Sequence, residues 1–418
     1  MVFFRVCTLL VGLIFLISCG EKTDPAVTKE SDSLEAALRT FNALITETEK
    51  TLAQSKYFTS DVERAEAYRY LSGMMAVQLR DHLHFSVDPA YPTLHRVTSI
   101  GNKWGYSNPD NLYLAAGVSS DYDYRISGRL GSANHTIIGS YSGDDEDGLA
   151  GQRVLGRNLK TDPKGNFELY ISKTRPADAE NWIELVKDAT SITIYQVFGD
   201  WEKERKGSYR IEAIGMAGKS APLLSQKLAS QQLVTAGETV RDRIHDWMAI
   251  SKRLDLLPDN SFMPARQIQI ASLGSWFQYG NYDIEEDEAL IIEVNTPTNA
   301  RYWGLTLYNW WGETLDYKNR QTSLNHTQAH IDKDGKLRIV LAARDPGVQN
   351  WLDVSGHLRG PINWRVNDPE KPETFQTKKV KLSELSNHLP DQTSKITVEQ
   401  RRDIIAARQQ QVDWRYSE

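Results

Sequence analysis

The sequence predicts a mainly β protein with added helices, built from two jelly-roll-like β-sandwich domains that arose by internal duplication. Three observations support this fold class. Short stretches of alternating hydrophobic and polar residues, separated by turn motifs, occupy residues 95–216 and again 265–368, a pattern typical of sandwiches and jelly rolls. Several motifs recur between these two stretches at a nearly constant offset. The 418 residues also exceed the size that one hydrophobic core usually serves.

Charge and cysteine content exclude some classes of protein. The formal net charge is −6 and no basic run is present, so a surface that follows the phosphates of a nucleic acid is not expected. The only two cysteines are Cys7 and Cys19, both near the N-terminus. The body of the chain therefore has no internal disulfide and no thiolate zinc site, and we expect no cofactor.

The N-terminus resembles an export signal. An apolar run over residues 6–17 is too short to cross a bilayer comfortably but suits the hydrophobic part of a signal peptide. It ends in Leu16-Ile17-Ser18-Cys19, which resembles the lipobox of bacterial lipoproteins. That resemblance implies that residues 1–18 are a signal peptide and that Cys19 carries lipid after cleavage. An ordinary signal peptide, or a buried helix with an incidental cysteine, is the alternative.

The same resemblance implies a location in the bacterial cell envelope. Gly20 follows the cysteine where lipoproteins retained in the inner membrane commonly have aspartate, so we expect a lipid anchor in the outer membrane, facing the periplasm. The lipid bilayer is then one partner of the chain. Residues 19–33 are polar and suit a flexible tether between the anchor and the folded part.

Helical periodicity appears outside the two β-rich stretches. Residues 34–85 predict two helices, the second with a capping box that begins at Ser60, and we expect this segment to pack on the first β-domain. Residues 217–258 predict a helical connector between the domains, with a break at Gly237. The C-terminal tail, 369–418, contains a polar helix that suits either a free surface or a docking partner.

The two β-rich stretches share motifs at a spacing of 169 or 170 residues. A hairpin glycine, an Asn-Trp pair and two strand positions match between the copies. We expect each glycine to adopt a positive φ in its turn, and each tryptophan to be a core residue at the end of its sandwich, with the preceding asparagine bonded to the backbone. The matched pairs are Gly165 and Gly335 (335−165=170), Asn181-Trp182 and Asn350-Trp351 (350−181=169), Ile192 and Ile362, and Ile194 and Trp364 (both 170).

The second copy carries a further ordered set of motifs. These are Tyr302-Trp303, Asn319-Arg320 with Ser323, Asp334-Gly335, Pro346-Gly347, Asn350-Trp351-Leu352 and Arg365. In this order they resemble the bacterial domain-of-unknown-function family numbered 1214, over residues 285–365. The resemblance implies jelly-roll-like β-domains with helices, and no established reaction. Residues 353–356 depart from the pattern, because the family usually has a proline-containing loop there.

Aromatic residues crowd one region of the second copy. On the expected strand 301–309, Trp303 and the leucines that follow face one way, and Tyr302 and Tyr308 face the other. One face must be core, and the other could form a stacking platform for a glycan or an apolar small molecule. The candidate ligand-binding residues are Tyr302, Tyr308, Trp310, Trp311, Asn319, Arg320 and Arg365.

A weaker set of residues suggests a metal site. His330-Ile331-Asp332 has the His-x-Asp spacing that places two ligands on one strand face, as in non-haem iron oxygenases, whose fold is a jelly roll. His326 would point to the same strand face as His330, because an even number of residues separates them. His357 could serve as a third ligand and Arg365 as a substrate clamp. Asp332 falls in the expected hairpin turn, however, and the first copy has no histidine at the corresponding place.

Three other motifs have a plainer interpretation. His82 and His84 would share one face of a strand and could reach a metal, but no third ligand is near in sequence. Residues 213–220 satisfy a relaxed phosphate-loop pattern, but the strand before them belongs to an antiparallel domain, so a glycine-rich connector is expected. The acidic run 144–148 lacks the spaced ligands of a calcium loop and fits a solvated loop.

These observations leave three hypotheses open. The first is a membrane-anchored ligand-binding or structural module. The second is an enzyme on a jelly-roll scaffold, either metal-dependent and oxygenase-like or hydrolytic. The third is an envelope assembly partner that docks through its C-terminal helix. The sequence contains no Gly-x-Ser-x-Gly or His-Glu-x-x-His motif, so it assigns no reaction.

Overall fold

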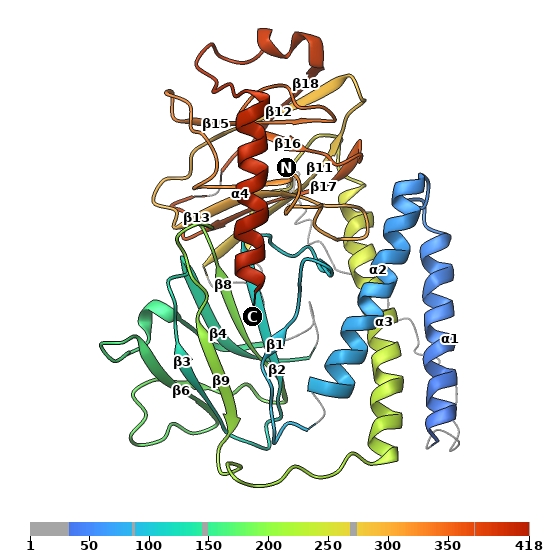
Figure 1. Cartoon of the computed structure of the whole chain (residues 1–418), viewed down its shortest axis with the longest axis vertical. Coiled ribbons are helices and arrows are strands. Elements are labelled where there is room, and N and C mark those ends of the chain that lie inside the picture. The colour runs from blue at the N-terminus through green and yellow to red at the C-terminus, as the bar shows by residue number, and fades with distance from the viewer. Residues whose placement is uncertain (1–32, 86–87, 144–148, 268–273, 372, 418) are drawn as a thin grey trace, which may run out of the picture.

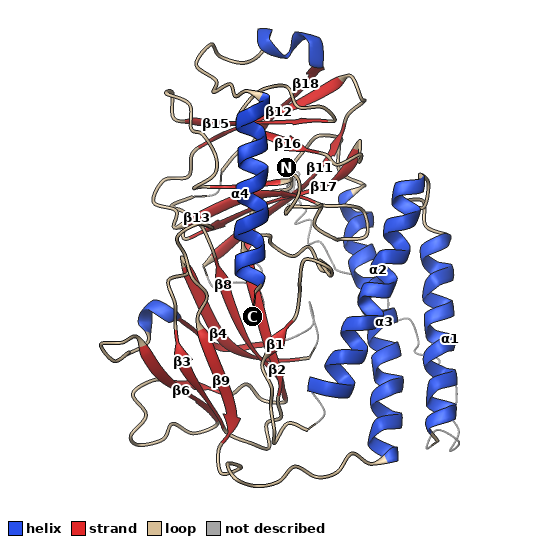
Figure 2. Cartoon of the chain, viewed as in Figure 1, coloured by secondary structure: helices blue, strands red, loops and turns tan. Residues whose placement is uncertain are grey.

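The computed structural model describes residues 33–85, 88–143, 149–267, 274–371 and 373–417. Two β-sandwiches follow one another along the longest axis, three long helices line one side, and a fourth helix crosses the junction (Figure 1). Figure 2 shows that the long helices lie outside the sandwiches. The expected fold class is therefore confirmed. The expected signal peptide, Cys19, nearly all of the tether and the acidic run 144–148 lie outside the described residues.

The two sandwiches have the same topology. In the first, the strand orders are β1-β2-β8-β4-β5 and β7-β6-β3-β9; in the second they are β10-β11-β17-β13-β14 and β16-β15-β12-β18. Adding nine to each strand number of the first copy gives the second. The pairs β6–β7 and β15–β16 are parallel in both copies. The strands are β1 (His95–Arg96), β2 (Asn111–Gly117), β3 (Tyr124–Arg129), β4 (His135–Ser142), β5 (Leu149–Leu155), β6 (Asn166–Ser172), β7 (Trp182–Glu184), β8 (Ala189–Val197), β9 (Ser208–Ala213), β10 (Arg266–Gln267), β11 (Ser275–Asp283), β12 (Glu288–Asn295), β13 (Tyr302–Leu307), β14 (Ser323–Asn325), β15 (Lys336–Ala342), β16 (Trp351–Asp353), β17 (Arg359–Asn367) and β18 (Gln376–Lys381).

The matched motifs have the same role in each copy. Gly165 and Gly335 have φ of 80° and 78° in equivalent hairpins, a conformation that glycine adopts without strain. Asn181 accepts from one backbone N–H at 2.8 Å and donates to two carbonyls at 2.9 Å. Asn350 makes the same three bonds at 2.8, 2.7 and 2.9 Å. Identical topology and identical bonding confirm the duplication.

The sequence predicts that the tryptophan after each asparagine closes the end of its sandwich, but neither tryptophan does so. Trp351 lies on the outer face of its four-stranded sheet, buried with Val340 and with Leu385 of the C-terminal tail. Trp182, at the equivalent place in the first copy, is only half-buried. The prediction of a core residue therefore fits Trp351 alone, because there the tail adds a second layer of apolar side chains over the sheet.

Each sandwich has its own core between its two sheets. Along β8, Ile192 and Ile194 are fully buried in the first core, and along β17, Ile362 and Trp364 are fully buried in the second. Successive side chains of a strand point to opposite faces. The residues between these core positions therefore lie on the outer faces of the five-stranded sheets.

Helices α1 (Leu34–Ala53), α2 (Asp61–Arg80) and α3 (Gln226–Leu254) form the layer beside the sandwiches. The predicted capping box at Ser60 is present at the start of α2. The predicted break at Gly237 is wrong, because α3 is one continuous helix. A Cβ at Gly237 would lie 3.0 Å from side-chain atoms of Leu44 and Phe41, so the glycine allows α1 to pack closely on α3.

The helical segment 34–85 contacts both sandwiches rather than the first alone. At the C-terminal end of α2, Arg80 donates to the carbonyl oxygen of Arg96 in the first sandwich at 2.6 Å. In the N-terminal half of α2, Glu66 lies 3.1 Å from His357 of the second sandwich. The short π-helix η1 (Asp81–Phe85) continues α2 toward β1. These helices therefore connect the two copies.

The C-terminal helix α4 (Val398–Tyr416) docks on its own chain. Arg401 pairs with Asp345 of the second sandwich at 2.9 Å. Arg408 and Arg415 lie over the ring of Trp201 in the first sandwich, at 4.7 and 4.4 Å from its centroid. All three arginines are buried, so the inward face of this polar helix is occupied within the chain. The remaining short helices are η3 (Gly156–Asn158) and η4 (Leu382–Asn387).

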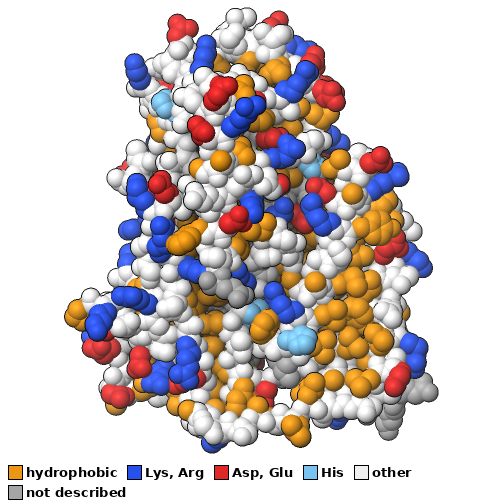
Figure 3. Space-filling view, viewed as in Figure 1, with side chains coloured by type: hydrophobic (Ala, Val, Ile, Leu, Met, Phe, Trp, Pro, Cys, Tyr) orange, Lys and Arg blue, Asp and Glu red, His pale blue; other side chains and the backbone are white. Residues whose placement is uncertain are grey.

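The helical side of the molecule exposes apolar surface. Figure 3 shows hydrophobic side chains gathered over the region of the helices. Exposed apolar residues on α1 and α2 are Leu34, Leu38, Val62 and Tyr68. Within the described ranges, no helix combines the length and the apolar character that a membrane span requires.

Candidate functional site

A cleft of about 580 Å³ lies between the two sandwiches and the helices. Its walls include the outer faces of both five-stranded sheets, chiefly β2 and β8 in the first copy and β11 and β17 in the second, and residues of α2 and α3 complete it. The duplication thus presents the same face of equivalent strands to one cavity. A volume of this size lies in the range of small-molecule binding sites.

The strand alternation that fills the cores also supplies the cleft walls. Every second residue of β17 from Ile362 to Val366 points into the core, so the intervening residues face outward. The outer row of β17 is Asn363, Arg365 and Asn367, and that of β8 at the equivalent positions is Thr193, Tyr195 and Val197 (365−195=170). Core positions are apolar in both copies, whereas the outer rows differ in chemistry.

Aromatic side chains dominate the lining. On the first sheet, Tyr113 and Tyr195 lie edge to face with ring centroids 5.2 Å apart. On the helical side, Trp104 and Trp247 are similarly arranged at 6.3 Å. The lining aromatic residues are Trp104, Tyr106, Tyr113, Tyr141, Tyr195, Trp247, Phe277, Tyr279 and Tyr302. The walls are therefore mainly apolar, with hydroxyl and indole groups at the ring edges.

Arg365 brings a buried positive charge to the cleft. The residue is 9% exposed, its guanidinium lies 5.6 Å from the centroid of the Phe277 ring, and its Nη2 donates to the carbonyl oxygen of Tyr106. Its Nη1 is buried and has no hydrogen-bond partner among the described residues. Buried polar atoms in proteins are nearly always hydrogen-bonded, so this nitrogen marks a place where a ligand oxygen would fit.

The cleft also contains an acid and a base. Asp81 Oδ1 lies 3.2 Å from Nε2 of His95 and 2.8 Å from Nη2 of Arg80. The other ring nitrogen of His95, Nδ1, lies 3.2 Å from the carbonyl oxygen of Thr93. Both nitrogens of His95 therefore face oxygen atoms of the chain. This arrangement orients the imidazole but leaves it no free nitrogen with which to act as a general base.

Tyr302, a predicted ligand-binding residue, lines the cleft within a network that joins the two sandwiches. Its hydroxyl donates to Asp110 Oδ2 at 2.5 Å and accepts from Asn108 at 2.9 Å. Asp110 is 2% exposed and also accepts from Trp201 and Asn325. Burial, followed by the charge of Asp110, holds the pKa of Tyr302 well above its usual range. The hydroxyl therefore stays protonated as a fixed donor.

Tyr308, Trp310 and Trp311 lie beneath the helices and do not line the cleft. Their exposed fractions are 0%, 4% and 0%, and Trp310 stacks on Tyr57 of the α1–α2 turn with ring centroids 4.9 Å apart. The prediction of opposite strand faces is confirmed, because Trp303 packs in the sandwich core and Tyr308 packs on the helices. These three aromatic residues hold the helical layer to the second sandwich.

Asn319 and Arg320 also lie outside the cleft. Arg320 pairs with Asp353 at 2.8 Å, and the side chain of Asn319 donates to Asp316 at 2.9 Å. Both contacts are within the second sandwich. Of the predicted ligand-binding residues, the structure brings Tyr302 and Arg365 to the cleft.

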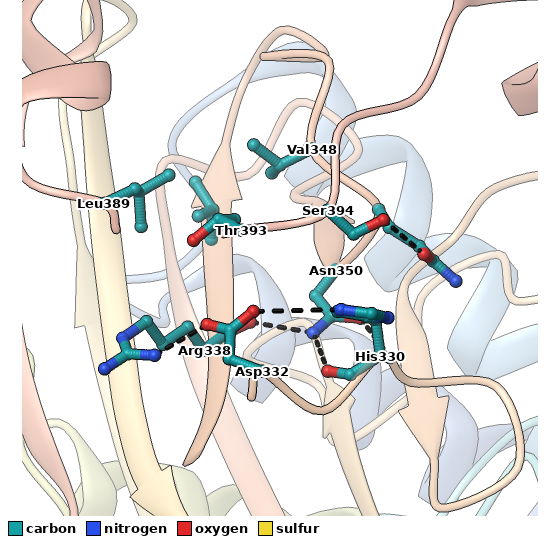
Figure 4. Close-up of a pocket in the computed structure, with 10 residues that line it drawn as sticks. His330, Asp332, Arg338, Val348, Asn350, Leu389, Thr393 and Ser394 are labelled. Carbon is teal, nitrogen blue, oxygen red and sulfur yellow. Dashed lines mark hydrogen bonds and ion pairs between the residues drawn. The ribbon is translucent and has the colours of Figure 1, made fainter. Parts of the chain in front are cut away.

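Of the residues predicted as metal ligands, Asp332 is paired with an arginine, and the two histidines lie apart from any third ligand in the described part of the chain. Asp332 pairs with Arg338 at 2.6 Å, and His330 Nε2 lies 3.9 Å from Asp332 beside a hollow of about 10 Å³ (Figure 4). That volume has room for roughly one water molecule. His326 packs edge-on against Tyr302 with ring centroids 5.7 Å apart. In the described part of the chain, no three His, Cys, Asp or Glu side chains are grouped to hold a metal.

The remaining motifs have different positions. His357 faces Glu66 at 3.1 Å. His82 and His84 were expected to share a strand face, but they lie in η1; His82 lines the cleft, with its Nε2 3.2 Å from Thr239 Oγ1. Residues 213–220 follow the antiparallel strand β9 and end six residues before α3 begins (226−220=6), which agrees with a connector.

The sequence reasoning missed the cleft residues of the first copy and of α3. Tyr195 and Tyr113 alternate with core residues, so the sequence shows that each points outward but does not show what each one faces. Once Arg365 is a candidate, the offset of 170 residues points to Tyr195 on the equivalent strand (365−170=195). Trp247 belongs to the apolar pattern of α3, and nothing in the sequence distinguishes it from a residue that only packs against other helices.

Comparisons with known proteins place part of this chain in a family. Residues 282–371 match the family model described as "Protein of unknown function (DUF1214)". The crystal structure of an uncharacterised protein from Burkholderia cenocepacia is 27% identical, with a TM-score of 0.78, over 83% of this chain and 97% of that one. The VPA0106 protein from Vibrio parahaemolyticus is 11% identical, with a TM-score of 0.43, over 75% of this chain and 98% of that one. No curated protein matches the chain. The matched residues lie in the second sandwich, and the matched family is the one that the motifs of this sandwich resemble.

Proposed function

We propose that this chain is a lipid-anchored protein of the bacterial cell envelope that binds a small molecule in the cleft between its two sandwiches. The observation that carries this proposal is the cleft itself, about 580 Å³ in volume and lined by aromatic side chains from both copies and the helices. The outer faces of a sandwich normally carry polar, solvated residues. Two outer faces that instead share an apolar cavity favour ligand binding.

The binding function has more support than the two alternatives. An assembly role through α4 has only the outer face of the helix available, because the face that carries Arg401, Arg408 and Arg415 is buried against the chain itself. An enzymatic role has less support, because both nitrogens of His95 face oxygen atoms of the chain and Asp332 is paired with Arg338.

The lipid anchor is tested by labelling cells with a palmitate analogue. Cys19→Ser should lose the label, whereas Cys7→Ser, the matched control at the only other cysteine, should keep it. Separation of the membranes should then place the labelled protein in the outer membrane. A label that survives Cys19→Ser would contradict the anchor, and a label in the inner membrane would contradict the location.

The cleft is tested by filling it. Ala115 lies on the outer face of β2 and lines the cleft, so Ala115→Trp should occupy space that a ligand needs. Lys164→Trp adds the same side chain at an exposed hairpin position and is the control. Binding of the neutral fluorophore pyrenebutanol, followed by energy transfer from tryptophan, should fall in the first variant and persist in the second. Equal binding in both variants would refute the proposal.

A further inference from the structure

We infer that the cleft takes an anion with an apolar body, an aliphatic or aromatic carboxylate, and that Arg365 is its anion contact. This inference rests on the proposed binding function and adds the chemical class of the ligand. The charge of the walls, the unused hydrogen-bond donors and the aromatic lining each support it.

The charge of the walls is positive. Within the described lining, the arginines are Arg243, Arg266 and Arg365, and the carboxylate is that of Asp81, which already contacts two neighbouring side chains. The whole chain has a formal net charge of −6, so the positive walls do not reflect overall composition. A cleft lined by one sign of charge between apolar walls concentrates ligands of the opposite sign.

Arg365 is a buried charge of the cleft that lacks a counter-ion among the described residues. There its guanidinium has one hydrogen bond, to Tyr106, and no carboxylate pairs with it. Arg338, another buried arginine, contacts three carboxylates. Arg415 is also without a hydrogen bond, but it stacks on Trp201 beneath α4 and does not line the cleft. A buried charge without a partner is costly, so a ligand that neutralises Arg365 would bind favourably.

Two further donors beside Arg365 are unused. Trp247 Nε1 and Asn367 Nδ2 are buried, belong to residues that line the cleft, and have no acceptor among the described residues. Tyr106 contacts both Arg365 and Trp247, through its carbonyl oxygen and through its ring at 6.1 Å. Asn367 lies two residues from Arg365 on the same face of β17. Because all three groups donate, the missing partner is an acceptor.

The unused donors suit a carboxylate. Its two oxygens accept several N–H bonds, including those of a guanidinium. The remaining walls are aromatic rings and small apolar residues, which bind hydrocarbon or a flat ring system through apolar area. A carboxylate with an apolar body satisfies both parts of the cleft.

The test compares two probes with the same body. Pyrenebutanoate carries a carboxylate, and pyrenebutanol replaces it with a neutral hydroxyl. Binding to residues 20–418, which lack the expected signal peptide and lipid anchor, is followed by energy transfer from tryptophan to pyrene. The variants are Arg365→Met, Arg365→Lys and Trp247→Phe. The control is Arg320→Met, which removes an arginine of the same sandwich outside the cleft. Circular dichroism checks that each variant is folded.

The unaltered cleft should bind pyrenebutanoate roughly tenfold to a hundredfold more tightly than pyrenebutanol, as expected for one charge-assisted hydrogen bond. Arg365→Met should abolish this preference, Arg365→Lys should restore part of it, and Trp247→Phe should lower it about threefold. Arg320→Met should leave it unchanged. If Arg365→Met fails to fold, Arg365→Lys and Trp247→Phe still decide the outcome, because each keeps the size or the ring of the residue it replaces.

Failure of this inference is distinguishable from failure of the binding function. Equal affinity for the two probes, with both excluded by Ala115→Trp, would overturn the anion assignment and leave the cleft as a binding site. A preference for pyrenebutanoate that Arg365→Met and Arg320→Met reduce equally would also overturn it. Binding of neither probe, or binding that Ala115→Trp does not affect, would overturn the proposed function itself.

Discussion

The carboxylate of Glu66 gives a quantitative test of how α2 is held to the second sandwich. Its Oε2 lies 3.1 Å from Nε2 of His357 and accepts from Asn309 at 2.8 Å, and Arg69 approaches its other oxygen at 3.3 Å. Burial alone would raise the pKa of this carboxyl group. The hydrogen bond and charge of His357, with the contacts to Asn309 and Arg69, instead lower the pKa from 4.5 to about 2.

The lowered pKa corresponds to a definite stabilisation. A decrease from 4.5 to about 2, at about 1.36 kcal/mol per pKa unit, gives about 3 kcal/mol in favour of the folded state. A group whose folded pKa is depressed contributes fully above its unfolded pKa and loses its contribution as the pH falls through the folded pKa. The contribution of Glu66 should therefore be complete at pH 7, about 1.4 kcal/mol at pH 3, and nearly absent below pH 2.

The perturbation is Glu66→Gln, which keeps the shape of the side chain and removes the charge. Urea unfolding, followed by tryptophan fluorescence, should show a loss of about 2–3 kcal/mol at pH 7 that shrinks by about half at pH 3. Glu47→Gln, on the exposed side of α1, is the control and should change the free energy of unfolding by less than about 0.5 kcal/mol at both pH values. A loss from Glu66→Gln that is equal at the two pH values would refute the linkage reasoning.

Three further predictions concern the fold. Asn350→Ala and Asn181→Ala each remove three hydrogen bonds to the backbone, so each should lower the free energy of unfolding by about 2–4 kcal/mol in urea titrations; a large effect in one copy alone would contradict a shared role. Gly237→Val should lower the free energy of unfolding by about 1–3 kcal/mol, because its Cβ would lie 3.0 Å from side-chain atoms of α1. Gly101→Val, with open space around it, is the control, and thermal unfolding should show little change in its melting temperature. Trp201→Leu should expose α4 to limited proteolysis, because two arginines of that helix lie over its ring; an unchanged cleavage pattern would show that other contacts suffice.

The duplication could be predicted from the sequence because its signals depend on only a few neighbouring residues. A hairpin that needs positive φ selects glycine, as at Gly165 and Gly335. An asparagine that closes three backbone bonds keeps its place relative to that turn, as at Asn181 and Asn350. Each of these requirements selects one residue type, so the same residues recur in the sequence at a fixed spacing. The order of all strands then follows once one copy is recognised as a repeat of the other.

Features that depend on distant segments could not be predicted in the same way. Gly237 looked like a helix break because glycine destabilises an isolated helix, but here α1 packs against it and α3 continues. Trp351 looked like a core residue in the same sense as Trp182, but it is buried by the C-terminal tail. The aromatic cluster around Trp310 looked like a binding platform, and the helices cover it. In each case a second element decides the role of the residue.

The cleft shows where the two copies diverge. At the inward positions of β8 and β17, the duplication keeps apolar residues, because each sandwich must fill a core of the same shape. At the outward positions, 170 residues apart, Tyr195 in the first copy corresponds to Arg365 in the second. Packing does not constrain these positions, so they are free to acquire different chemistry. The two outer faces line one cavity, in which aromatic residues come from both copies and the buried cation comes from the second. The difference between the repeats, rather than their likeness, therefore locates the candidate site.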